Sequence, residues 1–172
     1  MCGIIGILGR ENVAGRLVDG LRRLAYRGYD SAGVCAVVDG RIERRRAEGK
    51  LDNLASILTA NPLPGHSGIA HTRWATHGAP TTENAHPHAT EEVALVHNGI
   101  IENFKELREE LIAAGRRFES QTDSEVVAHL ISREVEAGVD PAEAVRRSLK
   151  RLRGAFALAI LFRQDPDLLI GA

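Results

Sequence analysis

The chain begins with the stretch MCGIIGIL at residues 1–8, a short apolar run rich in isoleucine and glycine that Gly9 ends. Its length and its β-branched residues predict a buried strand rather than a helix. A second apolar run follows at residues 31–38, and Asp39-Gly40 then predicts a hairpin turn into another strand over residues 41–47. The first quarter of the chain therefore predicts an antiparallel sheet.

Outward from these strands, apolar spacing predicts a helix between them, from Val13 to about Arg27. Three more helices are expected one after another, and the third of them begins at Pro141. The remaining expected segments are a helix over 51–58, strands over 68–75 and 93–97, an ordered loop over 76–90, helices over 103–114, 122–136 and 141–154, and strands over 155–162 and 168–170. Strands, then grouped helices, then strands do not fit simple βαβ alternation, so we predict a layered α+β fold with mainly antiparallel sheets.

Two local patterns refine the predicted helices. The sequence TDSE at residues 122–125 fits a capping box, in which Thr122 and Glu125 satisfy the first backbone N–H groups of a helix. The helix over 103–114 is expected to carry four apolar side chains on one face: Phe104, Leu107, Leu111 and Ile112.

Length and composition indicate one ordinary globular domain. The 172 residues are 44% apolar and 26% charged, with a net charge of −1. This balance argues against a nucleic-acid or membrane partner, and the start of the chain lacks the features of a secretory signal. Two cysteines do not form a disulfide framework, so we expect a cytoplasmic protein.

Cys2 is the first candidate for chemistry. If Met1 is removed, residue 2 carries both a thiol and a free α-amine, whose reference pKa of about 7.7 to 8.0 suits a base near neutral pH. An N-terminal threonine nucleophile works in this way. The alternative interpretation of Cys2 is a small buried residue in the first strand, and Cys35, inside an apolar run, is predicted to be core.

Asn98-Gly99 lies between two apolar runs and has two interpretations. An Asn-Gly pair in that context is typical of a two-residue hairpin turn. The same pair can form an oxyanion hole, since a side-chain amide and a backbone N–H can both point at one developing negative charge. The sequence leaves both open.

Arg73 and Asp123 form a possible clamp for an amino acid, because a guanidinium and a carboxylate match its carboxylate and ammonium groups. Taken alone, Asp123 is also explained as a residue of the first turn of a helix. Six of the seven histidines fall between His66 and His97, which raises a zinc-binding domain as an alternative. Their spacing fits no recognisable ligand set and no phosphate-binding glycine loop is present, so we predict no metal and no cofactor.

Five separate motifs, in order, resemble one family. They are MCGIIG at residues 1–6, YRGYDSAG at 26–33, TRWATHG at 72–78 with NAHPH at 84–88, HNGIIEN at 97–103, and QTDSE at 121–125. The chain is similar to the class II glutamine amidotransferases, which are N-terminal nucleophile (Ntn) hydrolases, and within them to the glucosamine-6-phosphate synthases. The resemblance implies a four-layer αββα sandwich. It also implies glutamine hydrolysis through a thioester on Cys2.

The resemblance assigns further roles to matching residues. The α-amine of Cys2 relays the proton, Asn98 and Gly99 hold the oxyanion, Arg73 takes the α-carboxylate of glutamine, and Asp123 takes its α-amine. The other residues implied in the glutamine site are Thr76 and His77 as its lining, Arg27 and His86 as residues that order the pocket or its lid, and Trp74 as a gate on the ammonia path.

Partners are implied as well. L-glutamine is the substrate, and the ammonia passes to a sugar isomerase domain that acts on fructose 6-phosphate and has no counterpart in these 172 residues. Residues 1–172 are expected to be a glutaminase domain that is incomplete at its C-terminus, and a homodimer is one arrangement that the resemblance implies for the full-length enzyme. The alternative is a non-catalytic, truncated module that binds glutamine or a partner chain.

Overall fold

The computed structural model describes residues 2–75 and 78–172, and of Arg27 it describes the backbone only. The expectations for Met1, Thr76, His77 and the Arg27 side chain therefore lie outside the described residues. In chain order the elements are β1 (Gly3–Leu8), α1 (Ala14–Leu24), the 3-10 turn η1 (Ala25–Arg27), β2 (Ser31–Val38), β3 (Arg41–Glu48), α2 (Leu51–Ala60), β4 (Ser67–Arg73), β5 (His88–Ala89), β6 (Val93–Gly99), α3 (Phe104–Ala113), α4 (Ser124–Glu136), α5 (Pro141–Leu149), β7 (Phe156–Phe162) and β8 (Leu169–Gly171).

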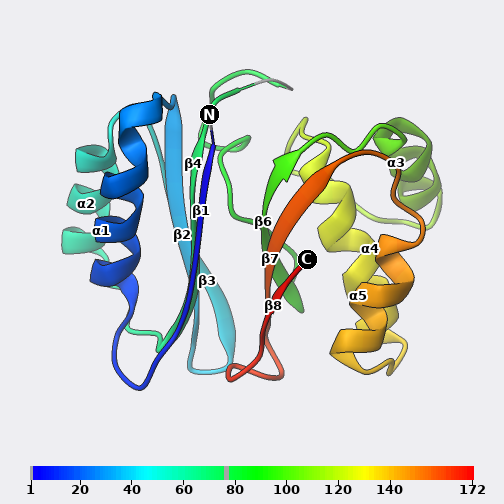
Figure 1. The fold of residues 1–172 in the computed structure, drawn as a ribbon. Coiled ribbons are helices and arrows are strands. Elements are labelled where there is room, and N and C mark those ends of the chain that lie inside the picture. The colour runs from blue at the N-terminus through cyan, green and yellow to red at the C-terminus, as the bar shows by residue number, and fades with distance from the viewer. Residues whose placement is uncertain (1, 76–77) are drawn as a thin grey trace.

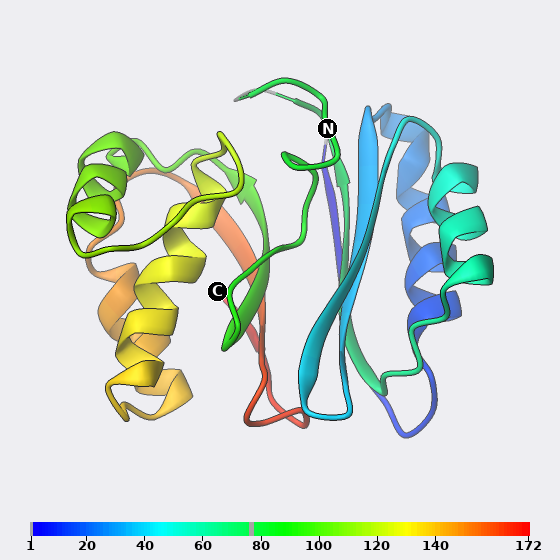
Figure 2. The same cartoon turned by 180° about the vertical axis from the view of Figure 1, so that it is seen from behind.

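Two antiparallel four-stranded sheets face each other, in the strand orders β1-β4-β2-β3 and β5-β6-β7-β8. Helices α1 and α2 cover the outer face of the first sheet, and α3, α4 and α5 cover the outer face of the second (Figure 1). The view from behind shows the same order of layers (Figure 2). The predicted αββα sandwich is confirmed.

Each strand directs alternate side chains to opposite faces, so each sheet contributes to two cores. Val34 and Ala36 of β2 pack under α1 and α2, whereas Cys35 between them lies in the core between the sheets. On β6, Leu95 packs under the helices of the second layer and Val96 faces the first sheet. The prediction that Cys35 is core is confirmed, and its burial raises the pKa of its thiol to about 12.

The predicted hairpin at Asp39-Gly40 is confirmed. Both residues have positive φ, 49° and 72°, and β2 and β3 pair antiparallel on either side of them. Two residues with left-handed backbone give the turn a twist that matches the twist of the flanking strands.

Two expected element boundaries and one expected helix face were wrong. The region 76–90 is not wholly a loop, because His88–Ala89 pairs with Leu95 and Ala94 of β6, and a strand of two residues is too short to show a period. Ile112 is 52% exposed, since 100° per residue places it beyond the buried stripe of α3. Helix α5 ends at Leu149, because the Asn103 side chain hydrogen-bonds to the backbone of residues 151 and 153.

The predicted capping box was also wrong, although α4 does begin at Ser124. The hydroxyl of Thr122 lies 3.0 Å from Nε2 of His88 and does not cap the helix. The Glu125 carboxylate accepts hydrogen bonds from the backbone N–H groups of Glu119 and Ser120. Thr122 thus has a partner far away in the chain, and Glu125 binds the loop that precedes the helix, so neither side chain makes the contacts of a capping box. In the described ranges, none of the helices is both long enough and apolar enough to span a bilayer.

Candidate active site

Three strands bring Cys2, Arg73 and Asn98 to the same end of the space between the sheets. Cys2 directly precedes β1, Arg73 ends β4, and Asn98 is the second-last residue of β6. Alternation places Cys2 on the face of Ile4, Arg73 on the face of Ile69, and Asn98 on the face of Val96. These three apolar residues belong to the core between the sheets, so the three polar side chains extend that core at one end.

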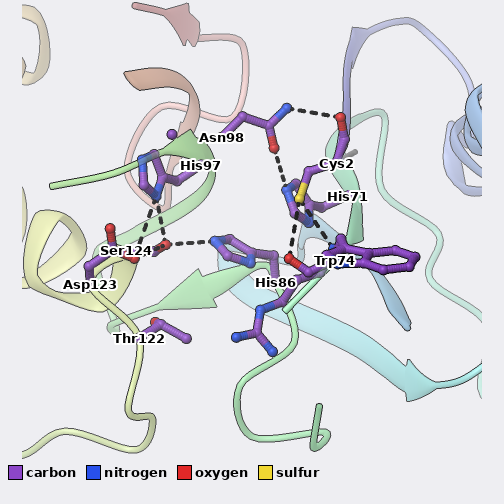
Figure 3. A pocket seen from close by; sticks show the side chains of 11 residues that line it. Cys2, His71, Trp74, His86, His97, Asn98, Thr122, Asp123 and Ser124 are labelled. Atoms are coloured by element: carbon purple, nitrogen blue, oxygen red, sulfur yellow. Dashed lines mark hydrogen bonds and ion pairs between the residues drawn. The ribbon is translucent and has the colours of Figure 1, made fainter. Parts of the chain in front are cut away.

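A small pocket of about 40 Å³ lies at this end, with room for a few water molecules. Side chains from both sheets and from the start of α4 surround it (Figure 3). The predicted site residues that it brings together are Cys2, Arg73, Trp74, His86, Asn98, Gly99 and Asp123. Its other lining residues are His71, His97, Thr122 and Ser124, which the sequence analysis did not assign to the site.

The Cys2 sulfur is held against the end of β4. The backbone N–H of Trp74 lies 3.2 Å from Sγ, in position to donate a hydrogen bond to it. Asp30 fixes this segment, since its N–H donates to the Arg73 carbonyl at 2.8 Å and its carboxylate accepts from the Ala75 N–H at 2.5 Å. Asp30 lies within the motif at residues 26–33, but its role is not predictable from the sequence, because a bend after a glycine gives no pattern that predicts which backbone it will bind.

Asn98-Gly99 is not a hairpin turn. Strand β6 continues through both residues, which pair with Ala157 and Phe156 of β7, and three helices separate these strands in the chain. The Ile100 N–H donates to the Ala155 carbonyl, and hydrogen-bonded pairs alternate along an antiparallel ladder, so the Gly99 N–H points away from β7. Its φ of 124° favours glycine, and a Cβ there would lie 2.1 Å from the Ala155 carbonyl oxygen.

Arg73 and Asp123 are both buried, with 4% and 5% exposure. The Arg73 guanidinium donates to the carbonyls of Ala79 at 3.2 Å and Gly78 at 3.5 Å. Burial lowers its pKa, while the negative charges of Asp30 and Asp123 act against that shift. Asp123 does not cap α4 through its side chain; its Oδ2 accepts from the Ile101 N–H at 2.8 Å.

Trp74 lies at the surface of the site, whereas His86 is buried. The Trp74 side chain is 53% exposed, and a Cβ on Gly28 would lie 2.9 Å from its ring. His86 is 4% exposed, and its Nε2 lies 2.9 Å from the hydroxyl of Ser124. The exposed position of Trp74 is therefore compatible with a gate, and the buried position of His86 is compatible with a residue that orders the pocket.

Four histidines form a cluster at the pocket, and three of them, His71, His86 and His97, line it. The His86 ring lies 4.2 Å from that of His71, 4.5 Å from that of His88 and 6.4 Å from that of His97. Burial lowers the pKa of His71 to about 4 and of His88 to about 3, and it lowers the pKa of His86 well below its usual value. Within residues 2–75 and 78–172, no three histidine, cysteine or acidic side chains are arranged to hold a metal ion.

These neutral rings predict that the fold loses stability in mild acid. His71 and His88 have folded pKa values of about 4 and 3, against an ordinary value of 6.5. Between those limits the unfolded chain binds protons that the folded chain does not, so stability falls as the pH drops below about 6.5. Each ring is expected to remove about 2 kcal/mol from the free energy of unfolding by pH 5.

Urea unfolding at pH 7, 6 and 5 measures this loss. The variant His66→Asn is the matched control for a histidine outside this cluster, because His66 lies in the loop before β4 with its side chain 40% exposed. Equal unfolding free energies at pH 7 and pH 5 would contradict the prediction.

Comparison with known proteins identifies one matching family and curated relatives that are much longer than this chain. The family described as glutamine amidotransferase domain matches residues 71–172. A glutamine–fructose-6-phosphate aminotransferase (isomerizing) of Zymomonas mobilis is 68% identical over 172 residues, which are 100% of this chain and 28% of that relative. The same enzyme of Brucella abortus is 64% identical with the same coverage. The chain thus spans less than a third of these curated relatives.

Solved structures share the fold. A glutamine phosphoribosylpyrophosphate amidotransferase from B. subtilis superimposes with a TM-score of 0.79 at 29% identity, over 95% of this chain and 35% of that one. A glutamine aminotransferase class-II domain protein from Silicibacter pomeroyi gives a TM-score of 0.64 at 18% identity, over 100% of this chain and 76% of that one. At 18% identity the second likeness concerns the fold alone.

Proposed function

Because this chain belongs to the glutamine amidotransferase domain family, we propose that it hydrolyses the side-chain amide of L-glutamine with Cys2 as the nucleophile. The observation that carries the proposal is the convergence of a thiol, an amide donor and an Arg–Asp pair on one pocket: Cys2, Asn98, Arg73 and Asp123. Acyl transfer needs a nucleophile, donors for the developing oxyanion, and groups that hold the substrate in place. Cys2 is the candidate nucleophile, Asn98 the candidate oxyanion donor, and Arg73 with Asp123 the candidate pair that holds the substrate.

In the first half of the proposed reaction, the Cys2 sulfur attacks the amide carbon of glutamine. After removal of Met1, the α-amine of Cys2 takes the thiol proton and passes it to the leaving nitrogen. The carbonyl oxygen becomes negative and accepts hydrogen bonds from Nδ2 of Asn98 and from the backbone N–H of Gly99. The C–N bond then breaks, ammonia leaves, and a glutamyl thioester on Cys2 remains.

In the second half, water attacks the thioester carbon. The same amine takes a proton from the water, and the oxygen is again held by Asn98 and Gly99. The C–S bond breaks, the proton returns to sulfur, and glutamate leaves. The sum is glutamine plus water giving glutamate plus ammonia, so Cys2 is regenerated.

Substrate recognition in this proposal depends on the buried charges of Arg73 and Asp123. Asp123→Asn is expected to raise the KM for glutamine by about 10- to 100-fold with a smaller change in kcat, because a hydrogen bond to a charged group is worth about 1.5–3 kcal/mol. The asparagine keeps an oxygen for the Ile101 N–H, so the melting temperature should change little. Steady-state glutamate release measures KM, and an unchanged KM would remove Asp123 from the clamp.

Glutamate release by the processed chain, supplied with glutamine alone, tests the proposed function directly. Turnover that depends on Cys2 supports it. Glutamine that raises the melting temperature without any release of glutamate would support a non-catalytic glutamine-binding module in its place.

The acceptor of the ammonia is proposed from the relatives. The Zymomonas and Brucella proteins are named for amino transfer from glutamine to fructose 6-phosphate with isomerisation, and the chain matches 28% of each. We infer that ammonia made here serves a sugar isomerase domain outside these 172 residues, with the half-exposed Trp74 on the path between the two. In such an assembly supplied with fructose 6-phosphate, the nitrogen of glutamine should be incorporated into an amino sugar. The variant Trp74→Ala should release a larger share of that nitrogen as free ammonia.

A further inference from the structure

His71, which the sequence analysis left without a role, contacts the proposed oxyanion donor from behind. Its Nε2 lies 2.8 Å from Oδ1 of Asn98, and Nδ2 of Asn98 lies 3.3 Å from the Cys2 carbonyl oxygen. The three residues form one line of contacts from β4 through β6 to the first residue of the site (Figure 3).

The donors and acceptors along this line have only one consistent order. The Cys2 carbonyl oxygen accepts hydrogen bonds and cannot donate them, so the NH₂ group of Asn98 must face it. Oδ1 of Asn98 then faces His71, and the 2.8 Å contact is a hydrogen bond only when Nε2 carries the proton. An amide turned the other way would set two oxygens against each other at the Cys2 carbonyl.

This order matters for the second hydrogen on Nδ2. An amide nitrogen carries two hydrogens, and the Cys2 carbonyl uses one of them. The plane of the amide is fixed at both ends, so the direction of the other hydrogen is fixed as well. A donor that is already oriented stabilises a developing charge without reorganising during the reaction.

We propose that His71 is a positioning residue that fixes the amide of Asn98, so that its remaining N–H points at the oxyanion formed on glutamine. The inference rests on the proposed glutaminase function. His71 is 1% exposed, within β4, with β1 and β2 as neighbours, so the ring has a rigid support. Its lowered pKa keeps the ring neutral near pH 7, which agrees with a single proton on Nε2.

The test compares two replacements of His71 in the full chain. His71→Leu removes the donor at similar volume and should lower kcat for glutamate release about 10- to 100-fold, somewhat less than the loss of an oxyanion donor, with KM changed less than about twofold. His71→Gln places an amide nitrogen near the position of Nε2 and should recover most of the lost kcat. A purely structural role predicts no such difference between leucine and glutamine at equal melting temperature.

A double-mutant cycle shows whether His71 acts through Asn98. Asn98→Ala removes the donor itself, so adding His71→Leu to it should cause no further loss of kcat. Losses that multiply, or equal losses in His71→Leu and His71→Gln, would overturn the inference. If His71→Leu does not fold, His71→Asn replaces it, because its shorter amide does not reach Asn98.

Two further results separate this inference from the proposed function. A parent chain that releases no glutamate overturns both. A parent that is active, together with a His71→Leu variant of equal kcat, overturns the positioning role alone. His66→Leu is the matched control, since this half-exposed histidine contacts Asp167 away from the pocket, and it should keep the parental kcat.

Discussion

Replacing Cys2 with alanine is expected to lower glutamine hydrolysis by about 10⁴-fold or more, since loss of a nucleophile from an acyl-transfer site removes the covalent route altogether. The fold should persist, because Cys2 precedes β1 and its sulfur contacts only the backbone at Trp74 among its described hydrogen bonds. Glutamate release and the melting temperature of the same preparation measure the two quantities. Turnover equal to that of the parent would end the proposal of Cys2 as the nucleophile.

Cys35→Ala is the matched control for this experiment. Cys35 is fully buried in the core between the sheets, and its raised pKa of about 12 keeps it a thiol. The variant should lose about 1 kcal/mol of stability from the small cavity and should keep its rate of hydrolysis. An alkylating reagent should modify Cys2 in the folded parent and leave Cys35 unmodified.

Blocking the α-amine of Cys2 is expected to lower the rate of hydrolysis about 10²- to 10⁴-fold, the usual contribution of a positioned general base. An amide nitrogen at this position cannot accept a proton near pH 7, whereas an α-amine with a pKa near 8 can. A cleavable leader peptide gives the comparison from one preparation, since removing it leaves Cys2 as the first residue. Mass spectrometry reports the state of the amine, and glutamate release reports the rate.

A leader attached elsewhere is the control for bulk at the site. The same peptide fused after Ala172, beyond β8, should leave hydrolysis unchanged. Full activity with the leader still on Cys2 would contradict the amine as base and would require another base, for which the described pocket offers His71, His86 and His97.

Most of the fold follows from local periodicity. The hairpin at Asp39-Gly40 was predictable because two residues determine both the turn and the register of the strands around it. The two-residue strand β5 and the early end of α5 were not, because each depends on a partner far away in the chain: β6 for one and Asn103 for the other. Tertiary contacts of this kind override local preference.

The site was predicted in part, and its least predictable members are those that act through others. Cys2 and Asn98 have chemistry that singles them out, and Arg73 is unusual in a buried strand. Asp30 and His71 bind backbone or amide groups whose positions exist only in the folded chain. One signal for His71 was available: it lies two residues before Arg73, and strand alternation therefore places both on the same face.

The antiparallel pairing of Gly3 with Thr72 fixes which residues of β1 face the second sheet and which face the helices. The direction of the Cys2 sulfur depends on this alternation. The isoleucines of β1 hold it in place, with Ile4 towards the facing sheet and Ile5 and Ile7 under the helices. One residue inserted between Cys2 and these anchors would reverse the alternation, and would turn the sulfur from the face that it shares with Ile4 to the opposite face of the sheet, which the helices cover. Such an insertion would therefore separate the sulfur from Asn98 and Arg73 even if every other contact of the sheet were kept.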